Sequence, residues 1–302
     1  TGTLSKGQLA VDLGEDAKED PDAVVTLILD NMDITCTVAP AIMFYNVYEC
    51  GKEEPENSSG KVDTTAAGAN VIIAAGSDNK ITGSHVARIY KEGTTKKLHK
   101  YDGAFYSRMS MNVTGEDDST SVLNIIGDNE GLDTERHLTI SGGVINIKAQ
   151  NDGINANADD VSVITINGGV LTVNGGLGDE GDGIDSNGYL DINGGTIWTM
   201  SHESTKDGGI DAVCDITING GTWDFQGSKG QVNAGVTLEA FRFMHGKNVS
   251  FTNMTMQNLK KSHYLTIEGL DNVTIQNCTF KDFQSITARK EAIHIDCMHN
   301  DS

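Results

Sequence analysis

The chain has 302 residues, a formal net charge of -21, and 35 glycines against only 3 prolines. The negative charge argues against nucleic acid and anionic membranes as partners, because both are bound by clustered Lys and Arg side chains. No apolar run approaches the roughly 18 residues of a membrane span, so membrane insertion is not expected. The chain begins at Thr1, which is typical of a processed or excised fragment, and we expect that any signal or anchor has been removed.

Residues 8–100 are predicted to form the first, irregular coils of a repeating structure. The segments 9–13, 24–29, 32–38 and 41–48 are rich in β-branched and aromatic residues and alternate between apolar and polar positions. The polar segment 52–65 is expected to be a loop in solvent.

The five cysteines show neither CxxC spacing nor an even count, which disfavours a zinc site or a disulfide framework. Cys36 and Cys50 could pair in an oxidising compartment. The sequence favours free, buried thiols instead, because a free cysteine usually behaves as a small core residue.

One phrase recurs four times in the middle of the chain, as in Ile164-Thr-Ile-Asn-Gly-Gly. Its first glycine recurs every 26 residues, at Gly142, Gly168, Gly194 and Gly220. A fixed period of this length predicts a solenoid, and it is too short for a propeller blade. The alternating aliphatic residues are expected to face inward, and Asn167, Asn193 and Asn219 are expected to stack as a ladder.

The sequence therefore predicts an all-β fold, a right-handed parallel β-helix that is a single-stranded solenoid continuous over residues 1–302. Regular Gly-Gly coils are expected over 101–230. Shorter coils of a different repeat type are expected over 231–302, where the phrase at Asn248 returns 24 residues later at Asn272. The C-terminal end shows no polar cap, which indicates end-to-end self-association or continuation into a longer surface protein.

A second repeat lies in the loops between the Gly-Gly phrases, as in Asn151-Asp-Gly-Ile-Asn and Gly181-Asp-Gly-Ile-Asp. Stacked coils should bring its oxygen-bearing side chains together. The candidate metal ligands are Asp152, Asn155, Asp179, Glu180, Asp182, Asp185, Asp207 and Asp211. Oxygen ligands without His or Cys point to Ca²⁺, which would relieve the repulsion between the carboxylates. The alternative is that the Asp-Gly pairs only form turns and face water.

Three residues are candidates for binding carbohydrate. Trp198 is exposed by the parity of its strand, and Tyr189 lies just before an inward leucine, so either ring could support a sugar. Arg108 could meet an acidic glycan. The competing interpretations are that Trp198 packs under a loop and that Arg108 pairs with surface carboxylates.

Several of these motifs resemble a known family. Asp102-Gly-Ala-Phe-Tyr-Ser, Asp152-Gly-Ile-Asn-Ala-Asn and Gly183-Ile-Asp-Ser-Asn-Gly, with the Ile-Asn-Gly-Gly-Thr phrases, are similar to the carbohydrate-binding β-helix domain of clostridial extracellular proteins, which has a pectate-lyase-like fold. The resemblance spans about residues 8–225, and the remainder is generically lyase-like. It implies a secreted or cell-surface protein that binds Ca²⁺ and plant polysaccharides such as cellulose or polygalacturonate.

The leading functional prediction is an extracellular, calcium-binding protein that binds such a polysaccharide without catalysis. One alternative is a polysaccharide lyase, in which Ca²⁺ acidifies the C5 proton of a uronate and a Lys or Arg removes it. Lys206 is then the candidate base, because it is adjacent to Asp207. The other alternative is a structural cell-surface or filament protein.

Overall fold

The computed structural model describes residues 1–86, 92–95, 101–178, 181–201, 209–220, 222–224, 241–244, 248–257, 265–268, 272–282 and 292–296. Within these residues the chain forms strands β1 to β27 and one short 3-10 helix, Glu15–Glu19. The paired strands run parallel to each other. The all-β class with parallel strands that the sequence predicts is thereby confirmed.

The strands lie in three rows, which we name A, B and C. Row A contains β3 (Val25–Leu29), β6 (Ala69–Ile73), β9 (Met111–Gly115), the first parts of β12 (Leu138–Ala149) and β14 (Val163–Asn174), β16 (Tyr189–Ile192), β19 (Ile216–Ile218), β22 (Asn248–Thr252) and β25 (Asn272–Gln276). Row B contains β1 (Gly2–Leu4), β4 (Met32–Thr35), β7 (Asp78–Gly83), β10 (Val122–Gly127), the second parts of β12 and β14, β17 (Thr196–Met200), β20 (Thr222–Asp224), β23 (Thr255–Gln257) and β26 (Thr279–Lys281).

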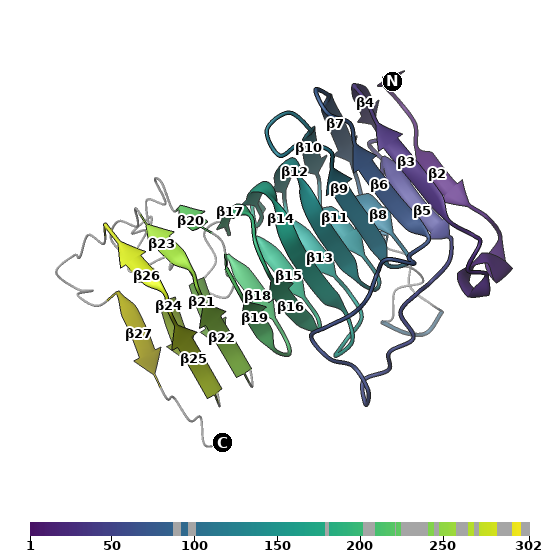
Figure 1. Ribbon diagram of the computed structural model, residues 1–302. Helices are drawn as coiled ribbons and strands as arrows, with labels where there is room; N and C mark the ends of the chain where they lie inside the picture. The colour runs from purple at the N-terminus through teal and green to yellow at the C-terminus, as the bar shows by residue number, and fades with distance from the viewer. Residues whose placement is uncertain are drawn as a thin grey trace.

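Row C contains β2 (Leu9–Asp12), β5 (Ile42–Asn46), β8 (Gly103–Ser107), β11 (Glu130–Thr134), β13 (Ile154–Ala156), β15 (Ile184–Ser186) and β18 (Ile210–Ala212). A further sheet of β21 (Phe241–Met244), β24 (Leu265–Glu268) and β27 (Ile293–Asp296) contacts β18. From β2 to β20 the chain visits rows C, A and B in turn, so each circuit adds one strand to each row. From β21 onward the further sheet takes the place of row C in each circuit. Figure 1 shows the strands stacked side by side from the purple N-terminal end to the yellow C-terminal end.

Aliphatic side chains in matching positions form the core between the rows. In row A, Leu138, Ile164, Leu190 and Ile216 pair in succession. In row C, the equivalent positions are Leu132, Ile154, Ile184 and Ile210. Each of these side chains is at most 3% exposed. The two-residue period of a strand puts them on one face, and the fixed repeat stacks them on each other, as the sequence predicts.

The Gly-Gly phrase marks the bend between row A and row B. Gly143, Gly169 and Gly195 have φ angles of +93°, +97° and +95°, which residues with a Cβ rarely adopt. Beside this bend the predicted asparagine ladder is present. Asn193 Nδ2 donates to Asn167 Oδ1 at 3.0 Å, and Asn219 Nδ2 donates to Asn193 Oδ1 at 2.8 Å.

The segment 52–65 is a loop, as its composition predicts, but it also contacts residues far away in the sequence. It has no strand, and most of its residues are exposed, but it lies across the outer side of row A. Ser58 Oγ donates to the Asp160 carbonyl at 2.6 Å, and the hydroxyls of Thr64 and Thr139 are 2.7 Å apart. Figure 1 shows this long dark-blue segment running past the teal strands. Its hydroxyl groups satisfy polar groups that the outward positions of row A present.

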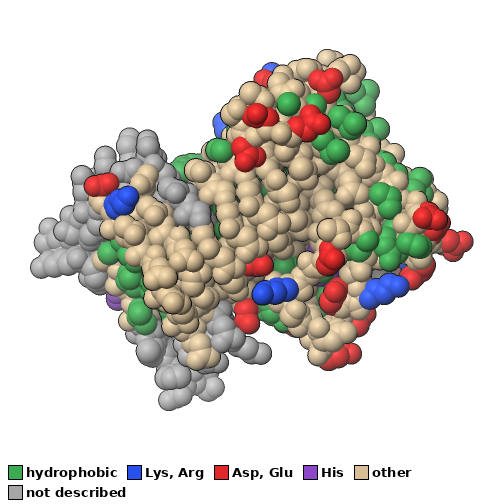
Figure 2. All heavy atoms as spheres, in the orientation of Figure 1, with side chains coloured by type: hydrophobic (Ala, Val, Ile, Leu, Met, Phe, Trp, Pro, Cys, Tyr) green, Lys and Arg blue, Asp and Glu red, His purple; other side chains and the backbone are tan. Residues whose placement is uncertain are grey.

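The thiols of Cys36 and Cys50 are not joined, and Cys36 is buried in the core. Among the described residues, no helix has the length and apolar character needed to cross a membrane. On the face shown in Figure 2, acidic side chains gather along the upper edge and the lower right part, whereas Lys and Arg form small separate groups.

Candidate functional site

The outward positions of row C form a line of polar side chains. Asp133 pairs with Asn155, Asn155 with Asp185, and Asp185 with Asp211, each one strand further along the row. The structure therefore brings Asn155, Asp185 and Asp211 into one line, as the second repeat predicts. They face outward because the aliphatic residue before each of them, such as Ile154 before Asn155, fills the core.

Asp152 and Asp182 lie in the turns that precede strands β13 and β15. The backbone N–H of Asp182 donates to Asp152 Oδ1 at 2.7 Å, which joins the two turns. The glycine that follows Asp152 is needed for this approach. A Cβ on Gly153 would collide with Val173 and would lie 2.6 Å from the Gly183 carbonyl oxygen.

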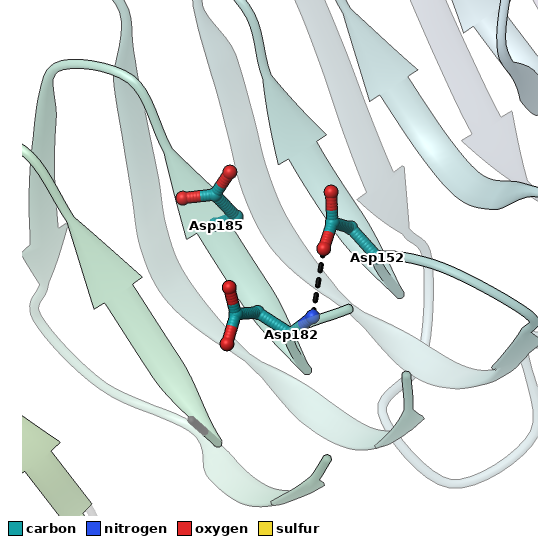
Figure 3. Close-up of side chains that lie close together, drawn as sticks. All are labelled: Asp152, Asp182 and Asp185. Carbon is teal, nitrogen blue, oxygen red and sulfur yellow. Dashed lines mark hydrogen bonds between the residues drawn. The ribbon is translucent and has the colours of Figure 1, made fainter. Parts of the chain in front are cut away.

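Three carboxylates converge at this point, those of Asp152, Asp182 and Asp185. Each offers one oxygen, and these oxygens all lie within 4.8 Å of one another (Figure 3). Asp152 is buried and the other two are half-buried. Burial, followed by the charges of Asp152 and Asp211, raises the pKa of the Asp185 carboxyl to about 8. The cluster therefore holds more negative charge than its surroundings stabilise.

A second group of oxygens lies next to the cluster, on Glu130, Asp133 and Asn155. These side chains are at least nine-tenths buried. Within the described part of the chain, Glu130 Oε2, Asp133 Oδ2 and Asn155 Oδ1 have no hydrogen-bond partner. Burial, and then the charge of Asp152, raises the pKa of Glu130 to about 8, and burial raises the pKa of Asp133 well above its usual value. Buried oxygens without donors are the arrangement that a cation satisfies.

Glu130 and Asp133 were not predicted from the sequence as site residues. A signal was present, because Gly131-Leu132-Asp133 occupies the same register as Gly153-Ile154-Asn155. This copy of the second repeat is hard to recognise in the sequence, because Glu130 occupies the position at which the next two circuits have an aspartate. Four candidates, Asp179, Glu180, Lys206 and Asp207, lie outside the described residues.

The three candidates for carbohydrate binding lie on three different rows. Trp198 is half-buried on β17 in row B and pairs with Thr172. Tyr189 is half-buried on β16 in row A, where its hydroxyl lies 3.3 Å from Ser58 Oγ in the covering segment. Arg108 follows β8 in row C and lines a pocket of about 750 Å³. The structure therefore does not bring these three side chains together.

The fold and the site define an all-β protein of stacked parallel strands that carries an acidic group suited to a hard cation. The chain belongs to the family of carbohydrate-binding domain-containing proteins, which matches residues 1–298. Among solved structures, a polysaccharide lyase-like protein from C. thermocellum, a gadolinium derivative, is similar with 19% identity and a TM-score of 0.49. That similarity covers 99% of this chain and 85% of the other. Comparison with curated proteins gives no match.

Proposed function

We propose that this chain binds an extracellular polysaccharide without cleaving it, and that it is a right-handed parallel β-helix stabilised by Ca²⁺. Membership of a carbohydrate-binding family supports the polysaccharide. The handedness follows from the usual preference, because crossovers between parallel strands of one sheet are right-handed in about 98% of cases. The observation that carries the calcium proposal is the convergence of Asp152, Asp182 and Asp185.

The residues present fit Ca²⁺ in donor type. Carboxylate and amide oxygens are the ligands that Ca²⁺ prefers, and the group found among the described residues consists of carboxylates. Asp152, Asp182 and Asp185 would hold the ion, and Asn155 adds an amide oxygen without a hydrogen-bond partner. A bound ion would neutralise the cluster and tie the turn before β13 to the turn before β15. These side chains position the ion and exclude water on the core side.

Calorimetric titration of the chelator-treated protein with Ca²⁺ tests this proposal, with Mg²⁺ as the matched control. We expect binding of Ca²⁺ and a rise in melting temperature, because a ligand at 100 times its Kd stabilises the folded state by about 2.7 kcal/mol. Mg²⁺ should have a smaller effect, since it requires a smaller and more regular octahedral site. A melting temperature that is the same in EGTA and in Ca²⁺ would remove the calcium proposal.

Binding and cleavage are separated by one pair of measurements on cellulose and polygalacturonate. The expected result is co-sedimentation or retardation with at least one polymer and no rise in the absorbance of unsaturated uronide product when Ca²⁺ is present. Appearance of that product would establish a lyase instead and would direct attention to Lys206.

We also propose that the protein is secreted or displayed on the cell surface. An insoluble or polymeric plant-type glycan is met outside the cell. Extracellular modules also bind Ca²⁺ at sites with dissociation constants of about 10⁻⁴ to 10⁻³ M. Fractionation of the source cells, with detection of the intact chain by antibody, tests this localisation.

A further inference from the structure

A pocket of about 750 Å³ lies on the outer side of row C, at the N-terminal side of the carboxylate line. Its wall includes Tyr45 on β5, Tyr106 on β8 and Arg136 just after β11. Tyr106 pairs with Asp133 in the neighbouring strand, so the pocket adjoins the candidate cation site on one continuous face. Of the residues that line this pocket, only Arg108 was predicted from the sequence as a binding residue.

Three tyrosine rings form its aromatic surface. The centroids of Tyr101 and Tyr106 are 5.2 Å apart with an interplanar angle of 62°, and those of Tyr45 and Tyr101 are 5.9 Å apart at 86°. Tyr106 is 1% exposed, and its hydroxyl donates to Glu135 Oε1 at 3.1 Å, so its position is fixed. Tyr45 and Tyr101 are half-buried. Aromatic rings held in this way offer a flat apolar surface to the carbon face of a sugar ring.

Two guanidinium groups line the same pocket, and their partners are neutral. Arg108 Cζ lies 4.9 Å from the centroid of the Tyr45 ring, and its Nη1 donates to Asn46 Oδ1 at 3.1 Å. Arg136 donates to the backbone carbonyl oxygens of Glu53 and Gly51, both at 3.4 Å.

Neither arginine forms an ion pair within the described residues, although the chain has 43 acidic residues and 22 basic ones. Two acidic side chains of the pocket wall have other partners. Glu49 accepts hydrogen bonds from the backbone N–H of Ser110 and from its hydroxyl, and Glu135 accepts from Tyr106. The guanidinium charges are therefore available to a ligand carboxylate, which an arginine can bind through two parallel hydrogen bonds.

We propose that this pocket binds one carboxylate-bearing sugar residue of an acidic polysaccharide. The carboxylate meets Arg108 and Arg136, and the sugar ring lies against Tyr45 and Tyr101. This inference rests on the proposed function, because it assigns a place and a ligand chemistry to polysaccharide binding.

The test measures the affinity of the intact protein for polygalacturonate and for its fully methyl-esterified form, which lacks the carboxylate charge. Wild-type protein should bind the charged polymer more tightly. R108Q should weaken binding of polygalacturonate by about tenfold or more, the range expected for a charge-assisted hydrogen bond. It should change binding of the esterified polymer much less. R108K, which keeps the charge but loses the planar fork, should fall between wild type and R108Q.

Tyr45→Leu should weaken binding of both polymers, because the ring contacts the sugar rather than its carboxylate. K148Q is the matched control, since Lys148 is an exposed basic residue on β12 in row B. It should bind as wild type does. Melting temperatures verify that each variant folds, and R136Q replaces R108Q if the latter does not.

Unchanged binding of polygalacturonate by the arginine variants and Tyr45→Leu would overturn the pocket assignment while wild-type binding upholds the proposed function. An equal loss for both polymers in R108Q would overturn carboxylate recognition. Failure of wild-type protein to bind any polysaccharide is a different result, because it removes the proposed function itself.

Discussion

Two lines of polar side chains run along the same stack of strands, and they differ in how their polar groups are satisfied. The asparagine ladder beside the Gly-Gly bend joins Asn167, Asn193 and Asn219 by amide hydrogen bonds. The outward line of row C joins Asp133, Asn155, Asp185 and Asp211 in register. An amide both donates and accepts, so a ladder of amides satisfies itself, whereas an ionised carboxylate only accepts.

The difference shows how one repeat can produce both a frame and a site. At the bend, the repeat stacks groups that stabilise each other without any ligand. In row C it stacks groups that repel each other, and it leaves Glu130 Oε2 and Asp133 Oδ2 without donors. The hydrogen bonds of the asparagine ladder are satisfied within the protein alone. The repulsion along the carboxylate line of row C is relieved only when the carboxylates are protonated or bind a cation.

The largest expected effect comes from Gly153, a glycine of the second repeat. Gly153→Ala should destabilise the fold by about 3 kcal/mol, because overpacking of this kind forces backbone shifts. Its Cβ would meet Val173 and the backbone of the next turn. Gly168→Ala at the bend is the control, since its Cβ would meet no atom within 4 Å. Urea denaturation measures both, and equal effects would contradict the close approach of the turns in row C.

The pH dependence of the chelated protein is the next test of the comparison. The pKa values of Asp185 and Glu130 are raised to about 8, so the folded state holds protons that the unfolded state releases near pH 4. This contribution to stability is fully present at low pH and is lost as the pH rises towards 8. Asp152 and Asp211 face Asp185 and add to the effect.

With excess Ca²⁺ the trend should reverse, because protons compete with the ion for the carboxylates. Urea denaturation at pH values from 5 to 8, in EGTA and in Ca²⁺, measures both slopes. Identical slopes in the two buffers would be inconsistent with a cation at this site.

The effect of Asp185→Asn on stability should have opposite signs in EGTA and in Ca²⁺. In EGTA above pH 8, where the Asp185 carboxyl is ionised, it removes a buried negative charge and should stabilise the protein by about 1 kcal/mol, within the usual range for buried polar groups. In Ca²⁺ it removes a ligand and should lower both the affinity for the ion and the melting temperature. Destabilisation of similar size in both buffers would show that Asp185 acts only in packing.

The smallest effect is expected at the asparagine ladder. Asn193→Asp removes the amide donor to Asn167 and places a carboxylate near Asp191, but the position is exposed. We expect a loss below about 1 kcal/mol, because exposed polar substitutions cost little. The loss should be the same in EGTA and in Ca²⁺. A calcium-dependent change in melting temperature at this position would show that the two lines are not independent.

Much of the fold could be predicted from the period of the sequence repeats. Counting repeats predicts which residues stack, because a fixed period places equivalent residues next to each other. This gives the register of Leu138, Ile164, Leu190 and Ile216 and the line through Asn155, Asp185 and Asp211. The segment 52–65 has no repeat, so its contacts with Asp160 and Tyr189, more than 100 residues away, could not be read from its composition.

The sequence by itself determined the parallel all-β stack, its inward aliphatic core and two sets of stacked polar residues, Asp152 with Asp182 and Asn155 with Asp185 and Asp211, because each depends on a local period. The convergence of Asp185 with Asp152 and Asp182 was decided by the tertiary structure. Only the tertiary structure decided the partners of the non-repeating residues. It gathered Tyr45, Tyr101, Arg108 and Arg136 into one pocket, and it buried Glu130 and Asp133 beside the acidic cluster. Such contacts depend on which circuits become neighbours and how deeply each side chain is covered, and no local pattern encodes either property.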